Sequence, residues 1–164
     1  MPSSISSEME ENIVEFHIIG ELGNGTHYKT DKAVSLSSGK PLVIKYFKTS
    51  EKNKAKKLVY LQSLLADLKS NTHKCSSLMK YYDFRLDEET NQIIMIQEHS
   101  NKMIDFEYHI KNYGYIEESK LKIIAFQVIK AVRALSNIER SHGKLSLSNI
   151  FISNKFKVKV TDYC

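Results

Sequence analysis

The alternation of apolar and polar residues near the start of the chain predicts a pair of strands. Val14, Phe16 and Ile18 alternate with polar neighbours, which is typical of a half-buried strand. A turn that contains Gly23 and Gly25 follows, and a second strand is expected over residues 28–36. The N-terminal part of the chain is therefore expected to begin with antiparallel strands.

A third strand is expected after the turn at residues 37–41, which is rich in serine, glycine and proline. Side chains alternate between the two faces of a strand. One face then carries Val43, Lys45 and Phe47, and the other carries Leu42, Ile44 and Tyr46. Lys45 is the only charge on this otherwise apolar strand and so requires a binding partner.

Helical periodicity follows in two segments. Residues 51–69 place Leu58, Leu61, Leu65 and Leu68 on one buried stripe. Residues 118–138 form the longest helical pattern, with a main stripe of Leu121, Ile124, Ala125, Val128, Val132 and Leu135. Between the two helices, residues 79–86 and 92–97 are expected to form a β-hairpin.

Composition places the chain among globular proteins with a single core, because 41% of its 164 residues are hydrophobic and 26% are charged. The sequence has no run of eighteen apolar residues, and its first eleven residues are polar and acidic, so neither membrane spanning nor export is expected. Cys75 and Cys164 lack the spacing of a zinc site. Two thiols favour a reducing compartment, so we expect the cytoplasm or the nucleus.

Four short motifs occur in a fixed order. Residues 23–28 read GNGTHY and residues 42–45 read LVIK, while residues 142–149 read HGKLSLSN and residues 162–164 read DYC. Each motif alone is a weak signal, since most glycine pairs are simply turns. Their combined order and spacing make a chance match improbable.

Together these motifs resemble those of protein kinases, namely the glycine-rich loop, V-A-I-K, H-R-D-L-x-x-x-N and D-F-G. The resemblance implies an α+β, protein-kinase-like fold: an antiparallel β small lobe with one helix, and a truncated, mainly helical large lobe that ends at the D-F-G position. It implies a tail over residues 1–12, a small lobe over 13–97 and a partial large lobe over 98–164. Both a natural truncation and a fragment of a longer protein remain open.

The resemblance also implies ATP and Mg²⁺ as cofactors, bound weakly. The residues expected to contact the nucleotide are Gly23, Gly25, Val43, Lys45 and Glu98. Asn149 and Asp162 occupy the magnesium-binding positions, although Asp162 could also be an ordinary turn residue. Gln97 stands at the gatekeeper position, and the hinge begins at Glu98.

The catalytic machinery departs from the family pattern. Lys144 stands where the catalytic Asp belongs, and a lysine ammonium has no acceptor for the proton of a substrate hydroxyl. No acidic residue occurs between Lys52 and Ala66, where the helix should supply a Glu to the strand lysine; Asp67 is the one alternative left open. Gly143 replaces the Arg of H-R-D. No catalytic set is therefore intact.

The sequence therefore predicts a pseudokinase that acts as a nucleotide-binding or scaffolding module. A residual ATP-dependent Ser/Thr protein kinase is the first alternative, because metals and positioning supply much of phosphoryl transfer. A second alternative follows from the net charge of +5 and a cluster of lysines at positions 48–57, which could bind nucleic acid or an acidic partner, although a solvated helix face is favoured. The apolar helix at 118–138 is expected to be covered by a protein partner or by a second copy.

Overall fold

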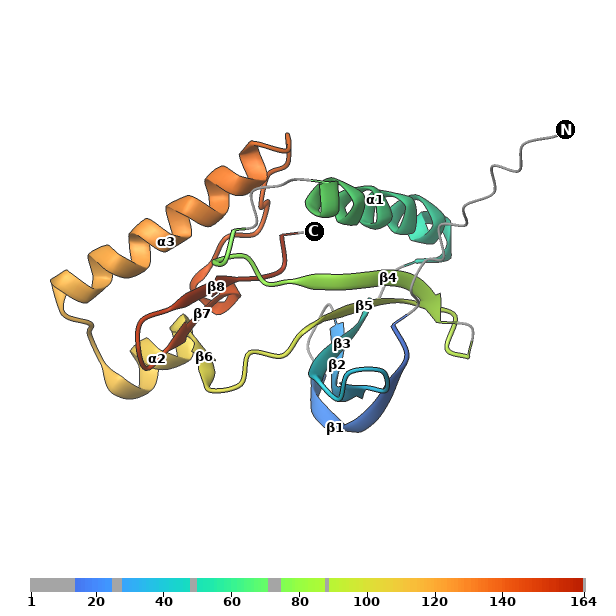
Figure 1. The fold of residues 1–164 in the computed structure, drawn as a ribbon, viewed down its shortest axis with the longest axis horizontal. Coiled ribbons are helices and arrows are strands. Elements are labelled where there is room, and N and C mark those ends of the chain that lie inside the picture. The colour runs from blue at the N-terminus through green and yellow to red at the C-terminus, as the bar shows by residue number, and fades with distance from the viewer. Residues whose placement is uncertain (1–13, 25–27, 48–49, 71–74, 88, 164) are drawn as a thin grey trace, which may run out of the picture.

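A computed structural model describes residues 14–24, 28–47, 50–70, 75–87 and 89–163, which form two sheets and three α-helices (Figure 1). The elements of the first part are β1 (Phe16–Asn24), β2 (Tyr28–Ser35), β3 (Pro41–Phe47), α1 (Glu51–Ser70), β4 (Tyr81–Asp87) and β5 (Gln92–Glu98). Those of the second part are β6 (Met103–Asp105), α2 (Phe106–Tyr113), α3 (Glu118–Ser136), the short 3-10 helix at Leu147–Asn149, β7 (Ile150–Ser153) and β8 (Val158–Val160). The α+β fold with an antiparallel N-terminal sheet is confirmed.

The first sheet has the strand order β1-β2-β3-β5-β4, and every neighbouring pair is antiparallel. The expected strands are present, but the expectation of a half-buried first strand is wrong. Ile18 is 43% exposed, and every β1 residue after Phe16 is exposed. The reason is that β1 is an edge strand paired only with β2, and the described helices pack on other strands, so little covers its faces.

The predicted alternation of β3 is confirmed by two separate apolar clusters. Leu42, Ile44 and Tyr46 belong to a cluster on the outer face of the sheet. Phe47 belongs to the larger cluster that also contains α1 and the second part of the chain. β3 is thus a central strand with both faces covered, which fixes the position of Lys45.

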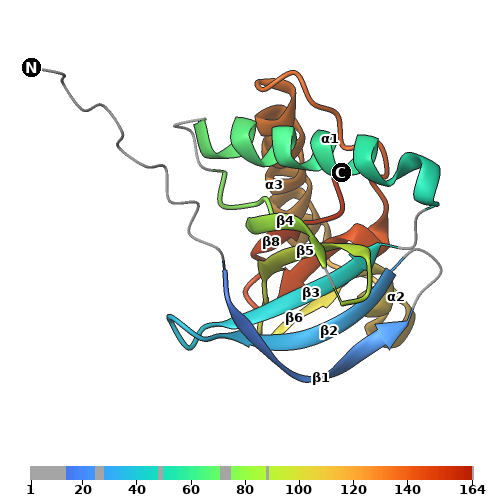
Figure 2. The ribbon, with the colours of Figure 1, turned by 90° about the vertical axis from the view of Figure 1, so that its right-hand side faces the viewer.

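Helix α1 covers the inner face of the sheet, beside β4 (Figure 2). Its Leu61, Leu64 and Leu65 are buried, while Leu58 and Leu68 pack against the same core from its edge. The predicted leucine stripe is therefore correct in position. Figure 1 shows that the end of the chain, after β8, runs up beneath this helix.

The second part contains two elements that sequence periodicity did not predict, β6 and α2. β6 pairs with β7 in the three-stranded sheet β6-β7-β8. The Asp105 side chain caps α2, since its Oδ1 accepts a bond from the Tyr108 backbone N–H at 2.7 Å. An aspartate before a short amphipathic run is a helix-start signal that could have identified α2.

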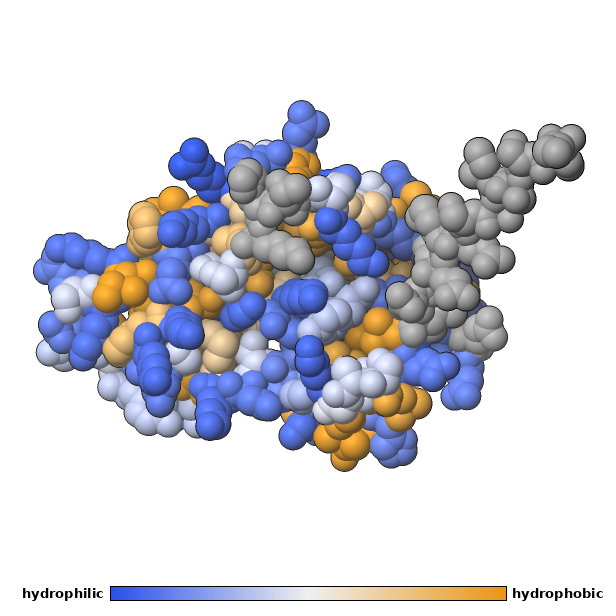
Figure 3. Space-filling view, in the orientation of Figure 1, coloured by the Kyte–Doolittle hydropathy of each residue, from blue (hydrophilic) through white to orange (hydrophobic). Residues whose placement is uncertain are grey.

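Helix α3 was expected to bury a wide apolar stripe, but it buries only Ile124, Ala131 and Leu135. Leu121 and Val132, which the stripe included, are 43% and 37% exposed. Figure 3 shows apolar side chains on the surface over α3, interspersed with hydrophilic ones. The described elements pack against one side of this helix: Val128 and Ala134 are partly buried against the core, whereas the apolar positions on the other side face solvent.

The two parts are joined where the segment before β4 runs beside β8. The Met79 N–H donates to the Val160 carbonyl at 2.8 Å, and the Val160 N–H donates to the Ser77 carbonyl at 2.7 Å. Farther from the sheet, Arg140 contacts Asp67 of α1 at 2.5 Å. None of the described helices has the length and apolar character needed to cross a membrane.

Candidate functional site

The site is centred on an ion pair between the two parts of the chain. The Lys45 Nζ, from β3, lies 2.5 Å from the Asp162 Oδ1, just beyond β8. Each side chain keeps only 11% of its surface exposed. The sequence alone placed Lys45 on an apolar strand without a partner; the structure supplies one from 117 residues later in the chain.

Tyr28 adds a second contact to the Lys45 ammonium. Its ring centroid lies 5.2 Å from the Lys45 Nζ, within the range of a cation–π interaction. The same ring meets Phe47 edge-on at 5.1 Å. Tyr28 stands at the third glycine position of the loop motif, and its contact with Lys45 could not be read from that position.

The backbone around Asp162 is held in an uncommon conformation. Asp162 has φ 58°, in the left-handed region that aspartate tolerates better than most residues. On one side, the Thr161 N–H donates to the Asn149 carbonyl at 2.9 Å. The Thr161 hydroxyl also donates to the Gln97 Oε1 at 3.4 Å. These bonds tie Asp162 to the loop at 142–149 and to β5.

Tyr163 anchors the other side of Asp162. Its hydroxyl donates to the Met79 carbonyl at 2.6 Å, and its ring stacks on Tyr81 at 4.5 Å. The His142 ring meets Tyr163 edge-on at 6.2 Å. Tyr163 is only 1% exposed, so the aromatic replacement at this position keeps a fully buried anchor.

The loop at 142–149 has an ordered internal hydrogen-bond pattern. The Asn149 Nδ2 donates to the Lys144 carbonyl at 2.8 Å, which leaves Oδ1 as the amide atom able to accept a bond or bind a metal. The Lys144 N–H donates to the His142 Nδ1 at 3.3 Å. The Lys144 side chain is exposed. The loop therefore keeps Asn149 oriented although position 144 carries an ammonium.

The other residues predicted to contact a nucleotide lie on the first sheet. Val43 is buried and faces Gln97 across the β3–β5 pairing. Gly23 lies in β1, paired with Thr30, whereas Gly25 is outside the described residues. Their contacts with a nucleotide remain predictions.

Glu98 has a structural role that the hinge position did not reveal. Its Oε1 lies 2.5 Å from the Lys159 Nζ and also accepts the Lys80 N–H at 2.8 Å. The backbone N–H of Glu98 donates to the Lys80 carbonyl at 2.9 Å. The Lys159 side chain is only 23% exposed in this pair.

Helix α1 supplies no acidic partner to Lys45 in the described structure. Asp67, the alternative for this role, accepts bonds from Arg140 instead, at 2.5 and 3.0 Å.

Two lysines of the basic cluster at positions 48–57 already have partners within the chain. Lys54 is buried and pairs with Glu51 at 2.6 Å, and Lys57 lies over the Phe47 ring at 5.1 Å. Lys48 lies outside the described residues.

Comparison with known proteins identifies this arrangement. A family model described as the protein kinase domain matches residues 16–164. The chain belongs to the protein kinase domain family. The expected family is thus confirmed.

Kinases from fungi and a microsporidian are similar to the chain over nearly its whole length. It is 29% identical to the serine/threonine-protein kinase PKH1 of Saccharomyces cerevisiae, over 92% of this chain and 19% of that protein. It is 27% identical to the serine/threonine-protein kinase VPS15 of the same yeast, over 91% of this chain and 10% of that protein. It is 24% identical to the probable serine/threonine-protein kinase KIN1 homolog of Enterocytozoon bieneusi, over 92% of this chain and 24% of that protein. The chain thus spans a quarter or less of these relatives.

His142 should make this kinase domain sensitive to mild acid. Burial lowers the pKa of its imidazole, and the Nδ1 must stay unprotonated to accept the Lys144 N–H. In the unfolded chain a histidine titrates near pH 6.5, so below about that pH the unfolded state binds the extra proton. The free energy of unfolding should therefore fall as the pH drops through about 6.5, and level off below the lowered pKa of the folded state.

Urea denaturation of the wild type and of His142→Gln between pH 5 and 8 measures this effect. The variant should lose part of the pH dependence, whereas His17→Gln, at an exposed position on β1, should keep all of it. Equal pH slopes for the wild type and His142→Gln would contradict this role of the buried imidazole.

Gly143 should be required for the backbone of the loop. Its φ is 73°, and an added Cβ would meet no atom within 4 Å, so only the backbone conformation opposes a side chain. Gly143→Ala should lower the free energy of unfolding by about 1–2 kcal/mol, the cost of a left-handed conformation. Gly20→Ala is the matched control, because that site is equally open and has no positive φ. Equal unfolding midpoints for the two variants would refute the requirement.

Proposed function

We propose that this kinase-family chain is a nucleotide-binding, non-catalytic module, in the manner of a pseudokinase, that presents surfaces to a protein partner. The observation that carries the proposal is Lys144. It occupies the catalytic-base position of a loop in which the Asn149–Lys144 hydrogen bond keeps its order. An ammonium cannot accept the hydroxyl proton of a substrate.

The residues present fit a nucleotide that brings its own magnesium. Among the described residues no group of three or more His, Cys, Asp or Glu side chains could hold a metal. Magnesium in phosphate-transfer sites is bound by one or two protein oxygens together with phosphate oxygens. Asp162 and the Asn149 Oδ1 supply such oxygens, and Lys45 supplies a cation for the phosphates.

Binding is expected to be weak because the phosphate-binding cation is already neutralised. The Lys45 ammonium is held by Asp162 and by the Tyr28 ring. The phosphates of a nucleotide would have to attract this ammonium away from Asp162, and a magnesium bound to them would share the same carboxylate. Nucleotide binding would thus replace the Lys45–Asp162 ion pair by contacts of the lysine with phosphate and of the carboxylate with metal. The net gain in free energy is smaller than it would be for a lysine without an ion-pair partner.

Thermal unfolding with ATP, with and without magnesium, tests nucleotide binding. A ligand specific for the folded state adds about 2.7 kcal/mol at a hundredfold excess over its Kd. The midpoint of the wild type should rise with MgATP, whereas Lys45→Met and Asp162→Asn, each compared with its own unliganded midpoint, should show little shift. Lys40→Met, an exposed lysine just before β3, is the matched control and should respond like the wild type.

Two outcomes would contradict the proposal. If MgATP leaves the wild-type midpoint unchanged, nucleotide binding is refuted and only a scaffolding role is left. Transfer of the ATP γ-phosphate to a protein substrate, abolished in Asp162→Asn, would instead support the residual Ser/Thr kinase. Lys45 and Asp162 are the observations that favour this alternative, because both are parts of an active kinase.

The surface proposed for a protein partner or a second copy is the outer face of α3. Ile123, Phe126 and Ile129 are 53%, 58% and 64% exposed there. Large apolar side chains gathered on one surface favour protein contact. This proposal concerns binding alone and does not depend on nucleotide.

Sedimentation velocity over a range of protein concentrations tests the α3 surface for self-association. The wild type should sediment faster than a monomer as concentration rises, and Phe126→Glu/Ile129→Glu should remain monomeric. Val59→Glu provides the control, because Val59 is 66% exposed on α1. If the wild type stays monomeric throughout and the double variant is no more soluble, α3 is not such a surface.

A further inference from the structure

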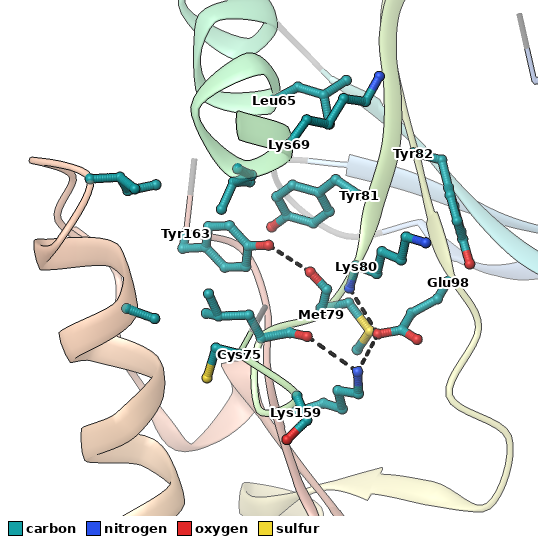
Figure 4. Close-up of a pocket in the computed structure, with 15 residues that line it drawn as sticks. Leu65, Lys69, Cys75, Met79, Lys80, Tyr81, Tyr82, Glu98, Lys159 and Tyr163 are labelled. Atoms are coloured by element: carbon teal, nitrogen blue, oxygen red, sulfur yellow. Dashed lines mark hydrogen bonds and ion pairs between the residues drawn. The ribbon is translucent and has the colours of Figure 1, made fainter. Parts of the chain in front are cut away.

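A cavity of about 530 Å³ lies on the side of α1, α3 and β4, separate from the Lys45–Asp162 pair (Figure 4). Neither Lys45 nor Asp162 lines it. Its walls come from the C-terminal end of α1, the segment that leads into β4, the C-terminal end of α3 and β8. A volume of this size falls within the range of about 300–1,000 Å³ that is typical of small-molecule sites.

The interior of this cavity is mostly apolar. Its apolar walls are formed by Leu65, Leu68, Leu78, Ala134, Ile138 and the ring of Tyr163. Leu65, Leu78 and Tyr163 are themselves core residues, so these walls are held in place by packing. A hydrocarbon or aromatic body would therefore be buried without rearrangement of the core.

The polar residues of the cavity are predominantly basic. Three lysines line it, Lys69, Lys80 and Lys159, against one carboxylate, Glu98. Lys159 is neutralised by Glu98 at 2.5 Å. Lys69 and Lys80 are exposed and so lie at the rim of the cavity. Among the residues that the structure describes, neither forms an ion pair; Lys80 lies over the Tyr82 ring at 4.9 Å. Figure 4 shows both lysines beside β4, whereas Cys75 lies on the side of α3.

We propose that this cavity binds a small amphipathic anion, a carboxylate or sulfonate on a hydrocarbon or aromatic body. The apolar walls would take the body, and the Lys69 and Lys80 ammonium groups would take the anionic group. An amphipathic cation would meet two uncompensated positive charges, and a neutral ligand would leave them unused. The charge balance of the cavity therefore selects the anion.

Cys75 provides a direct reporter, because its free thiol lines the cavity. The chain is prepared as Cys164→Ser, so that Cys75 is the only thiol in the sequence. The rate of its reaction with a maleimide is measured with increasing decanoate, kept below the concentration at which it forms micelles. Decanoate should slow the reaction at least about fivefold, while decyltrimethylammonium and decanol at equal concentrations should slow it much less.

Charge and shape variants make the test specific. Lys69→Gln/Lys80→Gln should raise the decanoate concentration for half protection about tenfold or more, as expected when the anion loses both of its charged partners. Lys52→Gln/Lys56→Gln is the matched control, since it removes two exposed lysines from the other end of α1, and it should leave that concentration unchanged. Ala134→Leu should weaken protection by filling the cavity, and its circular dichroism spectrum checks that it folds.

Three results would overturn the proposal. Decanoate could fail to protect Cys75, the cationic or neutral analogue could protect it equally well, or the two double-lysine variants could bind decanoate with equal affinity. Each would show that the cavity does not select an anion. None of these results depends on nucleotide binding, so the proposal of an anion site and the proposal of a nucleotide site can be refuted independently.

Discussion

The Lys45–Asp162 ion pair is the interaction on which the geometry of the candidate site depends. Both side chains are 11% exposed, so their charges are largely removed from water. Separating a buried pair by deleting one partner leaves an unpaired charge and costs about 3–5 kcal/mol in comparable cases. The pair joins β3 to the segment beyond β8, and thus fixes how the first sheet sits over the loop at 142–149. A nucleotide in the cleft would contact both of these parts at once.

The segment that carries Asp162 is held in place by hydrogen bonds and by ring stacking. Tyr163 is anchored by its bond to the Met79 carbonyl and by stacking on Tyr81, and Thr161 is bonded to Asn149 and Gln97. None of these contacts involves the residue at position 144. The packing around Asp162 therefore does not depend on which residue stands at position 144, so the proposed loss of the catalytic base would leave this part of the fold in place.

Periodicity and motif spacing predicted the elements that are long or tied to a motif. The alternation of β3 and the leucine stripe of α1 both follow from short-range pattern. What could not be predicted depends on contacts between distant residues. Neither the pairing of Lys159 with Glu98 nor the position of Tyr28 over Lys45 has a local signal. For α3, the pattern identified a helix, but burial depends on which other elements are present to cover it.

The absence of a helix carboxylate near Lys45 has a consequence for binding strength. In active kinases a glutamate from this helix holds the strand lysine, and the aspartate of D-F-G is left to hold magnesium. Here Asp67 is bonded to Arg140, and Asp162 is the carboxylate that holds Lys45. If Asp162 also holds magnesium, as proposed, one carboxylate would fill two roles that the active enzyme divides between two residues. Asp162 would hold a magnesium either through its second carboxylate oxygen, while Oδ1 stays bonded to Lys45, or through Oδ1 once the lysine turns to the phosphates. The lysine and a metal would therefore share one carboxylate, which supports the weak nucleotide binding proposed above.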